Sequence, residues 1–182
     1  MCTIYTHGVV GLGAGTLFAR SKMPASFWML AALLPMLPDV DSFWDAPYGS
    51  MLGHRGFTHS LLFALAVSLA AATLLRHRLW YVPLVIFFFV ITGSHGVLDA
   101  FTDGGFGIPL LWPFSNHRFG PRGPIHVSDI GFEIPNWRTS RTVQTELLYV
   151  WLPVAVIVAA RVLVWAWRRK RTRPGPTTRP AV

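Results

Sequence analysis

The stretch YVPLVIFFFVITGSHGVLDA, residues 81–100, combines two properties that decide the fold of this chain. Its first half is apolar, and its length matches the roughly 20 residues that an α-helix needs to cross a bilayer. Its second half carries His95 and Asp99, which are four residues apart and therefore share one helix face. Ionisable side chains inside an apolar segment are costly and are typical of functional sites. The stretch thus predicts a membrane-spanning helix that carries part of a polar site.

The composition of the whole chain also favours a membrane location. Of the 182 residues, 52% are hydrophobic and only 13% are charged, and the mean hydropathy is +0.44. These values are too apolar for an ordinary soluble domain of this size. The single cysteine, Cys2, excludes an internal disulfide and a zinc cluster built from cysteines. A bound metal is therefore expected on histidine and carboxylate side chains.

Five apolar segments predict an all-α fold, a polytopic helical bundle integral to the membrane. Clear spans are expected at residues 58–75, 81–100 and 147–167. Residues 3–19 are rich in glycine, which suits close helix packing in a bilayer. Residues 24–38 end at two prolines that limit helical continuation, so this segment is expected to be either a tilted span or a half-helix.

Threading these segments alternately through a bilayer separates the charges. One face receives ten Lys and Arg residues and no acid, and six of the ten lie in residues 168–182. Short cytoplasmic loops collect Lys and Arg, so this face is predicted to be cytoplasmic together with the C-terminus. Residues 1–167 then form the membrane-embedded domain with a polar external loop at 101–146, and residues 168–182 form a basic, disordered tail. The net charge of +8 is an orientation signal, and nucleic acid is not expected as a partner.

The same threading gathers histidines on the external face. Six of the seven are expected there: His7, His54, His59, His95, His117 and His126. They share this face with Asp39 and Asp41 of LPDVDSF (37–43) and with Asp99. Imidazole and carboxylate groups brought together make a site for zinc or a similar divalent ion. Simpler roles stay open for single residues: a hydrogen-bonded interfacial histidine at His7 or His126, a turn cap at Asp39 and an interfacial charge at Arg55.

Three motifs, LPDVDSF (37–43), HRGFTHS (54–60) and SHGVLDAFTDGG (94–105), follow an early TH at 6–7. In this order they resemble the LexA-regulated, membrane-bound, metal-dependent hydrolases, the YdjM-like family, over residues 3 to about 126. That family is distantly similar to the zinc-dependent phospholipase C superfamily, whose clustered ligands hold several metals. The resemblance implies a hydrolase of the bacterial inner membrane with one to three divalent ions, zinc being expected. It assigns metal-site positions to His7, Asp39, Asp41, His54, His59, His95 and Asp99.

The HRGFTHS motif raises a geometric question, because a regular helix would place His54 and His59 on different faces. Gly56 is therefore expected to allow a bend that turns both toward one cluster. Catalytic roles are expected for Arg55, Asp41 and Thr58. The guanidinium fork of Arg55 suits phosphate oxygens, and a site at the rim of the external leaflet favours a phospholipid or another lipid-linked phosphoester.

A metal-ion or solute transporter is the alternative from another functional class, since the same side chains could line an ion path. Such a path requires polar residues through the cytoplasmic half of the helices. Residues 61–75 and 82–91 offer little beyond Ser68 and Thr73. A non-catalytic membrane organiser is the third interpretation, and it leaves the polar cluster without a purpose. The sequence therefore favours the hydrolase.

Overall fold

The computed structural model describes residues 2–19, 22–77, 79–127 and 140–171, and every regular element in this part of the chain is helical. Helices η1 and η2 are 3₁₀-helices and η3 is a π-helical turn. In chain order the elements are α1 (Ile4–Phe18), α2 (Ala25–Leu33), η1 (Leu34–Phe43), η2 (Phe57–His59), α3 (Leu61–Leu75), α4 (Tyr81–Ala100), α5 (Arg141–Glu146), η3 (Leu147–Trp151) and α6 (Leu152–Arg171). The predicted all-α class is confirmed.

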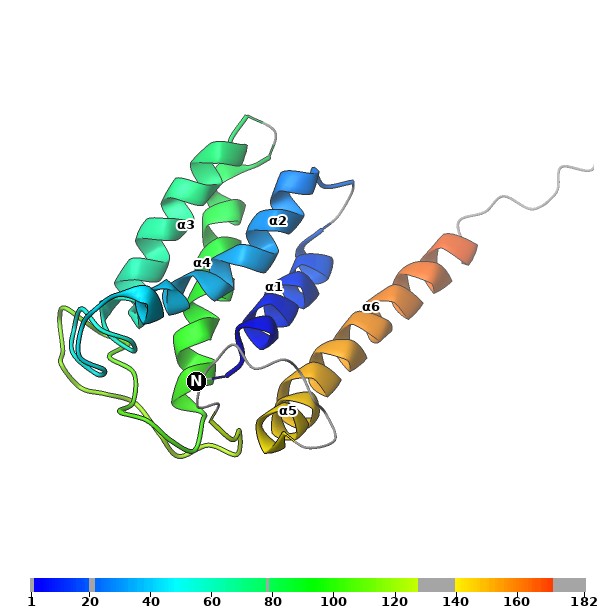
Figure 1. The fold of residues 1–182 in the computed structure, drawn as a ribbon. Coiled ribbons are helices and arrows are strands. Elements are labelled where there is room, and N and C mark those ends of the chain that lie inside the picture. The colour runs from blue at the N-terminus through cyan, green and yellow to red at the C-terminus, as the bar shows by residue number, and fades with distance from the viewer. Residues whose placement is uncertain (1, 20–21, 78, 128–139, 172–182) are drawn as a thin grey trace, which may run out of the picture.

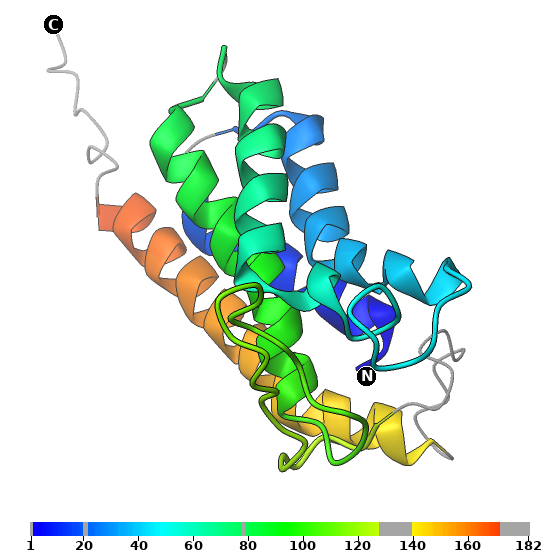
Figure 2. The ribbon, with the colours of Figure 1, turned by 90° about the vertical axis from the view of Figure 1, so that its left-hand side faces the viewer.

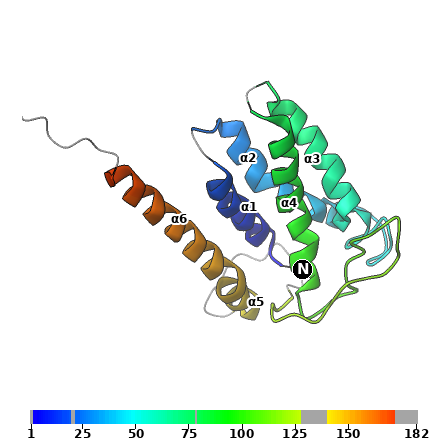
Figure 3. The same cartoon turned by 180° about the vertical axis from the view of Figure 1, so that it is seen from behind.

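Helices α1 to α4 form the body of the molecule, with α3 packed along α4 and α1 along α2 (Figure 1). Helix α6 packs against α1 and extends away from the other helices toward its C-terminal end (Figure 3). Residues 44–56 and 101–127, which follow η1 and α4, lie at one end of the bundle, where α5 also lies (Figure 2). This arrangement gathers most of the described residues outside the helices at a single end.

The apolar core occupies the opposite half of the bundle. Its residues come from α2 and η1, from the last turns of α3 and from the first half of α4: Phe27, Ala31, Leu34, Ala71, Ala72, Leu75, Leu84, Phe87, Phe88 and Ile91. The rings of Phe18, Phe27 and Phe87 stack on one another across α1, α2 and α4. The second half of α4, which carries His95 and Asp99, therefore continues beyond this core toward the end where the loops lie.

The glycines of α1 set its distance from two neighbouring helices. A Cβ atom at Gly11 would lie 1.9 Å from the carbonyl oxygen of Ala31 on α2, and one at Gly13 would lie 2.4 Å from Cγ1 of Val154 on α6. Real Cβ atoms do not approach other atoms so closely, so α1 packs as it does only because these residues lack side chains. The close packing expected of the glycine-rich segment 3–19 is confirmed.

Two helices of the described chain are long and apolar enough to cross a membrane, namely α4 and the continuous helical stretch Arg141–Arg171. Helices α1 and α3 have 15 residues each and α2 has nine, which is fewer than the roughly 20 residues of a full span. Helix α2 ends at Leu33 and the chain continues through Pro35 and Pro38 as a 3₁₀-helix, as the prolines predict. The number of spans stays a prediction.

The limits of the helices also bear on the expected division of the chain. Helix α5 begins at Arg141, so the expected loop at 101–146 includes helical residues at its end, and its residues 128–139 lie outside the described chain. Helix α6 continues to Arg171, so the first four residues of the expected tail are helical. Residues 172–182, for which disorder was expected, lie outside the described residues. The division at residue 167 stays a prediction.

Candidate metal centre

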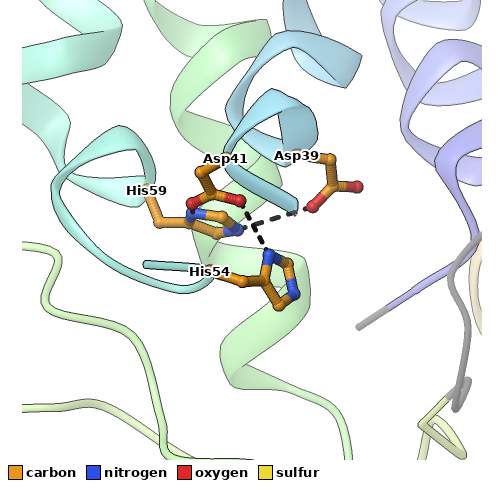
Figure 4. A group of neighbouring side chains, drawn as sticks. All are labelled: Asp39, Asp41, His54 and His59. Atoms are coloured by element: carbon orange, nitrogen blue, oxygen red, sulfur yellow. Dashed lines mark hydrogen bonds and ion pairs between the residues drawn. The ribbon is translucent and has the colours of Figure 1, made fainter. Parts of the chain in front are cut away.

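The 3₁₀-helix η1 presents two buried carboxylates in different directions. Asp39 and Asp41 are 0% and 1% exposed. A 3₁₀-helix has about three residues per turn, so side chains two positions apart point about two-thirds of a turn away from each other. Figure 4 shows Asp41 directed at His54 and Asp39 facing His59. The local backbone therefore gives the two acids of LPDVDSF different partners.

The segment that carries HRGFTHS is a tight turn followed by one turn of 3₁₀-helix, and α3 begins only at Leu61. Arg55 has a φ of 63°, in the left-handed region that few non-glycine residues adopt. A Cβ atom at Gly56 would lie 2.3 Å from the carbonyl oxygen of Met51, so only glycine fits there. The bend expected at Gly56 is present, and it brings the rings of His54 and His59 to 5.4 Å between centroids.

Asp41 is fully engaged by donors of the protein. Its Oδ1 lies 2.8 Å from Nδ1 of His54, and its Oδ2 accepts a hydrogen bond from Thr58 Oγ1 and lies 3.3 Å from Nδ1 of His59. Burial alone would raise the pKa of Asp41, but the hydrogen bonds from His54, His59 and Thr58 outweigh it and lower the pKa to about 2. Asp41 therefore orients His54 through its Nδ1, and it orients His59 together with Thr58, whose Oγ1 lies 3.1 Å from His59 Nδ1.

Asp39, in contrast to Asp41, is buried without hydrogen-bond donors from the described part of the protein. Its Oδ1 faces His95 Nε2 at 3.3 Å and His59 Nε2 at 3.6 Å. Neither oxygen of Asp39 has a hydrogen-bond partner, nor do these two Nε2 atoms, and all four atoms are buried. One ligand atom from each of Asp39, His59, His95 and Asp99 lies within 4.8 Å of every other. These buried groups could hold a metal ion.

The tautomer of His95 explains why its Nε2 is left without a partner. Nδ1 of His95 lies 2.7 Å from the carbonyl oxygen of Pro35. A carbonyl only accepts, so Nδ1 carries the proton and a neutral ring directs the lone pair of Nε2 at Asp39. Nδ1 of His59 lies 3.1 Å from Thr58 Oγ1 and 3.3 Å from Asp41 Oδ2, so this ring also turns its Nε2 toward Asp39. The lone pair of His95 Nε2 repels the carboxylate at which it points, and a cation between them would turn this repulsion into attraction.

A second group of possible ligands adjoins the first at Asp99. His7 Nε2 lies 3.5 Å from Asp99 Oδ1, and the His7 ring stacks on the His95 ring with 3.8 Å between centroids. The backbone N–H of Cys2 donates to the same Oδ1 at 2.9 Å. Ligand atoms of Cys2, His7 and Asp99 lie within 4.8 Å of one another. Metal ligands were expected on histidine and carboxylate, and the structure adds the Cys2 sulfur to the atoms that could hold an ion.

Arg55 lies inside the protein beside this cluster. Its side chain is 0% exposed, and its Nη2 lies 3.7 Å from Asp99 Oδ2. Nη1 donates to the Gly104 carbonyl at 2.8 Å and Nη2 to Thr102 Oγ1 at 3.2 Å, while Nε has no partner. Two of the five N–H donors of the guanidinium expected to face phosphate thus bond to protein groups, and Nε has no partner. Catalytic roles for Arg55 and Thr58 stay predictions.

The remaining polar residues of the loop end have separate partners. Arg118 donates to the carbonyl oxygens of Gly49, Arg55 and Gly107 and so ties three loop segments together. Two other histidines lie outside the cluster, because His117 packs edge-on to Phe119 and His126 pairs with Asp103 at the surface. Sequence reasoning expected both histidines on the same face as the cluster but named neither of them as a metal ligand.

The family model described as YdjM inner membrane protein matches residues 1–171. The chain belongs to the YdjM inner membrane protein family. It is 36% identical over 179 residues to inner membrane protein YbcI of Escherichia coli (strain K12), a match that covers 93% of this chain and 100% of the relative. It is 39% identical over 116 residues to inner membrane protein YdjM of the same organism, which covers 57% of this chain and 56% of that protein. No solved structure matches.

Membership of the YdjM family places the chain with proteins of the bacterial inner membrane, in association with the lipid bilayer. The resemblance seen in the sequence motifs is therefore confirmed at the level of the family. Besides Cys2, sequence reasoning missed the Pro35 carbonyl and Glu146. Glu146 is 2% exposed and directly precedes the apolar stretch LLYVWLPV, so an acid at the edge of a predicted span was the available signal.

Proposed function

We propose that this YdjM-family chain is a membrane-bound, metal-dependent hydrolase that holds a divalent ion, zinc being the best fit, at Asp39, His59, His95 and Asp99. The observation that carries the proposal is the set of buried ligand atoms without hydrogen-bond partners: His59 Nε2, His95 Nε2, both oxygens of Asp39 and Oδ2 of Asp99. Two imidazoles and two carboxylates form a nitrogen and oxygen set that zinc accepts. Leaving these atoms unpaired in a buried site costs free energy, which a bound cation would recover.

An ion bound there supplies a Lewis acid and a bound water of lowered pKa. His54 is the residue of this chain best placed to move a proton, because its side chain is 15% exposed whereas those of Asp41 and His59 are fully buried. Its Nδ1 is held by Asp41, which leaves Nε2 to accept a proton from a water molecule or to give one to a leaving group. In this arrangement His54 acts on protons, and Asp41 orients it.

We further propose a phosphoester of a membrane lipid as the substrate, at the external face of the membrane. The cluster lies at the end of α4, a candidate span, and exposed apolar side chains occur at the end of η1, as at Phe43, and in the segment after α4, as at Phe106. At such a position a lipid head group would approach from the side and water from above. Arg55 adds a positive charge next to Asp99, and its unpaired Nε is a donor that suits an anionic substrate.

The structure gives the transporter less support than the hydrolase. Beyond the cluster, the half of the bundle built from the rest of α4, α2 and the end of α3 is packed with buried Phe27, Leu84, Phe87 and Phe88. Among the described residues of that half, the buried side chains with polar atoms are short ones such as Ser68, whose hydroxyl bonds to the Ala64 carbonyl. An ion path needs a continuous polar lining, and this core interrupts it.

The test combines metal analysis of the purified protein with a phosphate-release screen over lipid substrates. The parent is expected to contain zinc or a similar ion and to release phosphate or a phosphorylated head group. His95→Ala should lose both the metal and the activity, whereas the matched control His117→Ala, a loop histidine outside the cluster, should keep both. Full metal content in His95→Ala and also in His59→Ala would defeat the assignment. Turnover of carboxylic esters alone would overturn the phosphoester part.

The external location is tested by topology. The ten basic residues on one face predict a cytoplasmic C-terminus. A reporter that is active only in the periplasm, fused after residue 182, should therefore be inactive, and a reporter that folds only in the cytoplasm should be active there. The reverse pattern would move the site to the cytoplasmic face and would leave the metal proposal untouched.

A further inference from the structure

Cys2 lies beside the cluster in surroundings that packing alone does not explain. Its side chain is 0% exposed and contacts an apolar group formed with Ile125 and Val150, as a structural cysteine would. Next to it, however, both ring nitrogens of His7 are buried and have no hydrogen-bond partner. A neutral imidazole has one donor and one acceptor, so leaving both unmatched costs free energy. The apolar contacts account for the burial of Cys2 but leave this histidine unexplained.

The two oxygens of Asp99 divide the ligand atoms into two groups. Oδ1 faces His7 Nε2 at 3.5 Å and accepts the Cys2 N–H at 2.9 Å. Oδ2 faces Arg55 Nη2 at 3.7 Å and His59 Nε2 at 3.9 Å. The group on the Oδ1 side contains the sulfur of Cys2, and its ligand atoms lie within 4.8 Å of one another. The Asp99 carboxylate thus contacts one set of side chains through Oδ1 and a different set through Oδ2.

We propose that Cys2 Sγ, His7 and Asp99 form a second metal site, of thiolate, imidazole and carboxylate type, next to the site at Asp39, His59 and His95. Thiolate and imidazole ligands select zinc and related borderline ions over magnesium or calcium. On binding, the Cys2 thiol loses its proton to solvent and the sulfur gives an electron pair to the ion. The inference rests on the proposed function only through the shared Asp99.

Cobalt(II) tests this site directly, because it occupies zinc sites and reports its ligands by its absorption spectrum. The full chain is purified without a histidine tag, stripped with a chelator and titrated with cobalt. Cys2 is the only cysteine of the chain, so a thiolate-to-cobalt charge-transfer band in the near ultraviolet can come from no other side chain. The parent is expected to show this band together with the weaker visible bands of cobalt bound to nitrogen and oxygen ligands.

Two variants separate the two sites. Cys2→Ser, which exchanges one atom, should lose the near-ultraviolet band and one bound equivalent of cobalt while keeping visible bands from the other site. Asp39→Asn should weaken the other site and keep the near-ultraviolet band. Cobalt-loaded parent with visible bands but no thiolate band would overturn the Cys2 site alone, and so would an unchanged metal count in Cys2→Ser. A parent that binds no cobalt at all would overturn this site and the proposed metal centre together.

Discussion

Glu146 and Asp39 are both buried carboxylates, with 2% and 0% exposure, but the protein treats them differently. Glu146 accepts hydrogen bonds from the backbone N–H and hydroxyl of Thr3 and from the hydroxyl of Thr6. Asp39 has no hydrogen-bond partner on either oxygen. Burial of a charge therefore does not distinguish a candidate metal ligand from a structural residue in this fold. The distinction lies in whether the chain itself supplies the donors.

The Glu146 cluster has a structural purpose that its position explains. Glu146 ends α5, just before the π-helical turn Leu147–Trp151, and Trp151 Nε1 donates to Thr6 Oγ1 at 2.7 Å. These bonds hold the start of α6 against the first turn of α1. His7, the next residue after Thr6, is thereby kept at Asp99. Glu146, whose oxygens are paired, thus fixes the first turn of α1, which carries His7, a residue whose ring nitrogens are unpaired.

The largest effect is expected from Asp39→Asn, measured as metal affinity. The change keeps the shape of the side chain but removes its charge, so affinity should fall by more than about 100-fold, beyond the range for residues that only orient ligands. The metal-free variant should be at least as stable as the metal-free parent, because an unpaired buried charge has been removed. Isothermal titration and unfolding in detergent measure the two quantities. A less stable metal-free variant with unchanged affinity would make Asp39 a structural residue like Glu146.

Glu146→Ala should instead lower stability and spare the site at Asp39, His59 and His95. Three buried donors lose their acceptor, and each costs on the order of 1 kcal/mol, so we expect a loss of about 2 to 3 kcal/mol in the free energy of unfolding. Glu146→Gln, which keeps one acceptor oxygen, should lose less. Unfolding in detergent with a chelator present should still show this difference, because the bonds of Glu146 themselves involve no ion. Unchanged stability in Glu146→Ala would show that the hydrogen bonds of Glu146 do not stabilise the fold.

Helical periodicity predicted part of this site, and tertiary contacts supplied the rest. His95 and Asp99 could be paired from the sequence because they are four residues apart on one continuous helix, α4. The contact of Cys2 with Asp99 joins residues 97 apart, and that of Thr3 with Glu146 joins residues 143 apart. No local pattern encodes such contacts. The close approach of α1 to α6 at Gly13 is one such tertiary feature.

The directions in which the side chains of Asp39, Asp41 and Arg55 point depend on backbone conformations that residue spacing does not reveal. The motif LPDVDSF offers two acids, and only the 3₁₀ form of η1 shows that they face different partners. The backbone of Arg55 is left-handed, and its side chain turns inward to Asp99 and Gly104. Residue spacing therefore predicts which side chains come together better than it predicts the direction in which each one points.

Asp41→Asn should have an intermediate effect and would sharpen the contrast with Asp39. The side chain orients His54 and His59 through their Nδ1 atoms, so its loss should reduce metal affinity by about 10- to 100-fold without abolishing binding.

Because the folded-state pKa of Asp41 is lowered to about 2, its contribution to stability is present above the unfolded value of about 4 and is lost as the pH falls toward 2. The variant should therefore lose less stability than the parent in that range. An affinity loss as large as that of Asp39→Asn would make Asp41 a direct ligand.

The smallest effect is expected at the surface pair of Asp103 and His126, which are 2.7 Å apart, closer than any histidine and carboxylate of the Asp39 group. Their side chains are 41% and 36% exposed, so water and salt screen the interaction. Asp103→Asn keeps an acceptor for the Val127 N–H and should cost less than about 1 kcal/mol, with unchanged metal content. Thermal unfolding at low and high salt, with metal analysis, measures this. Loss of metal here would mean that short distance, rather than burial without a donor, marks the ligands of this protein.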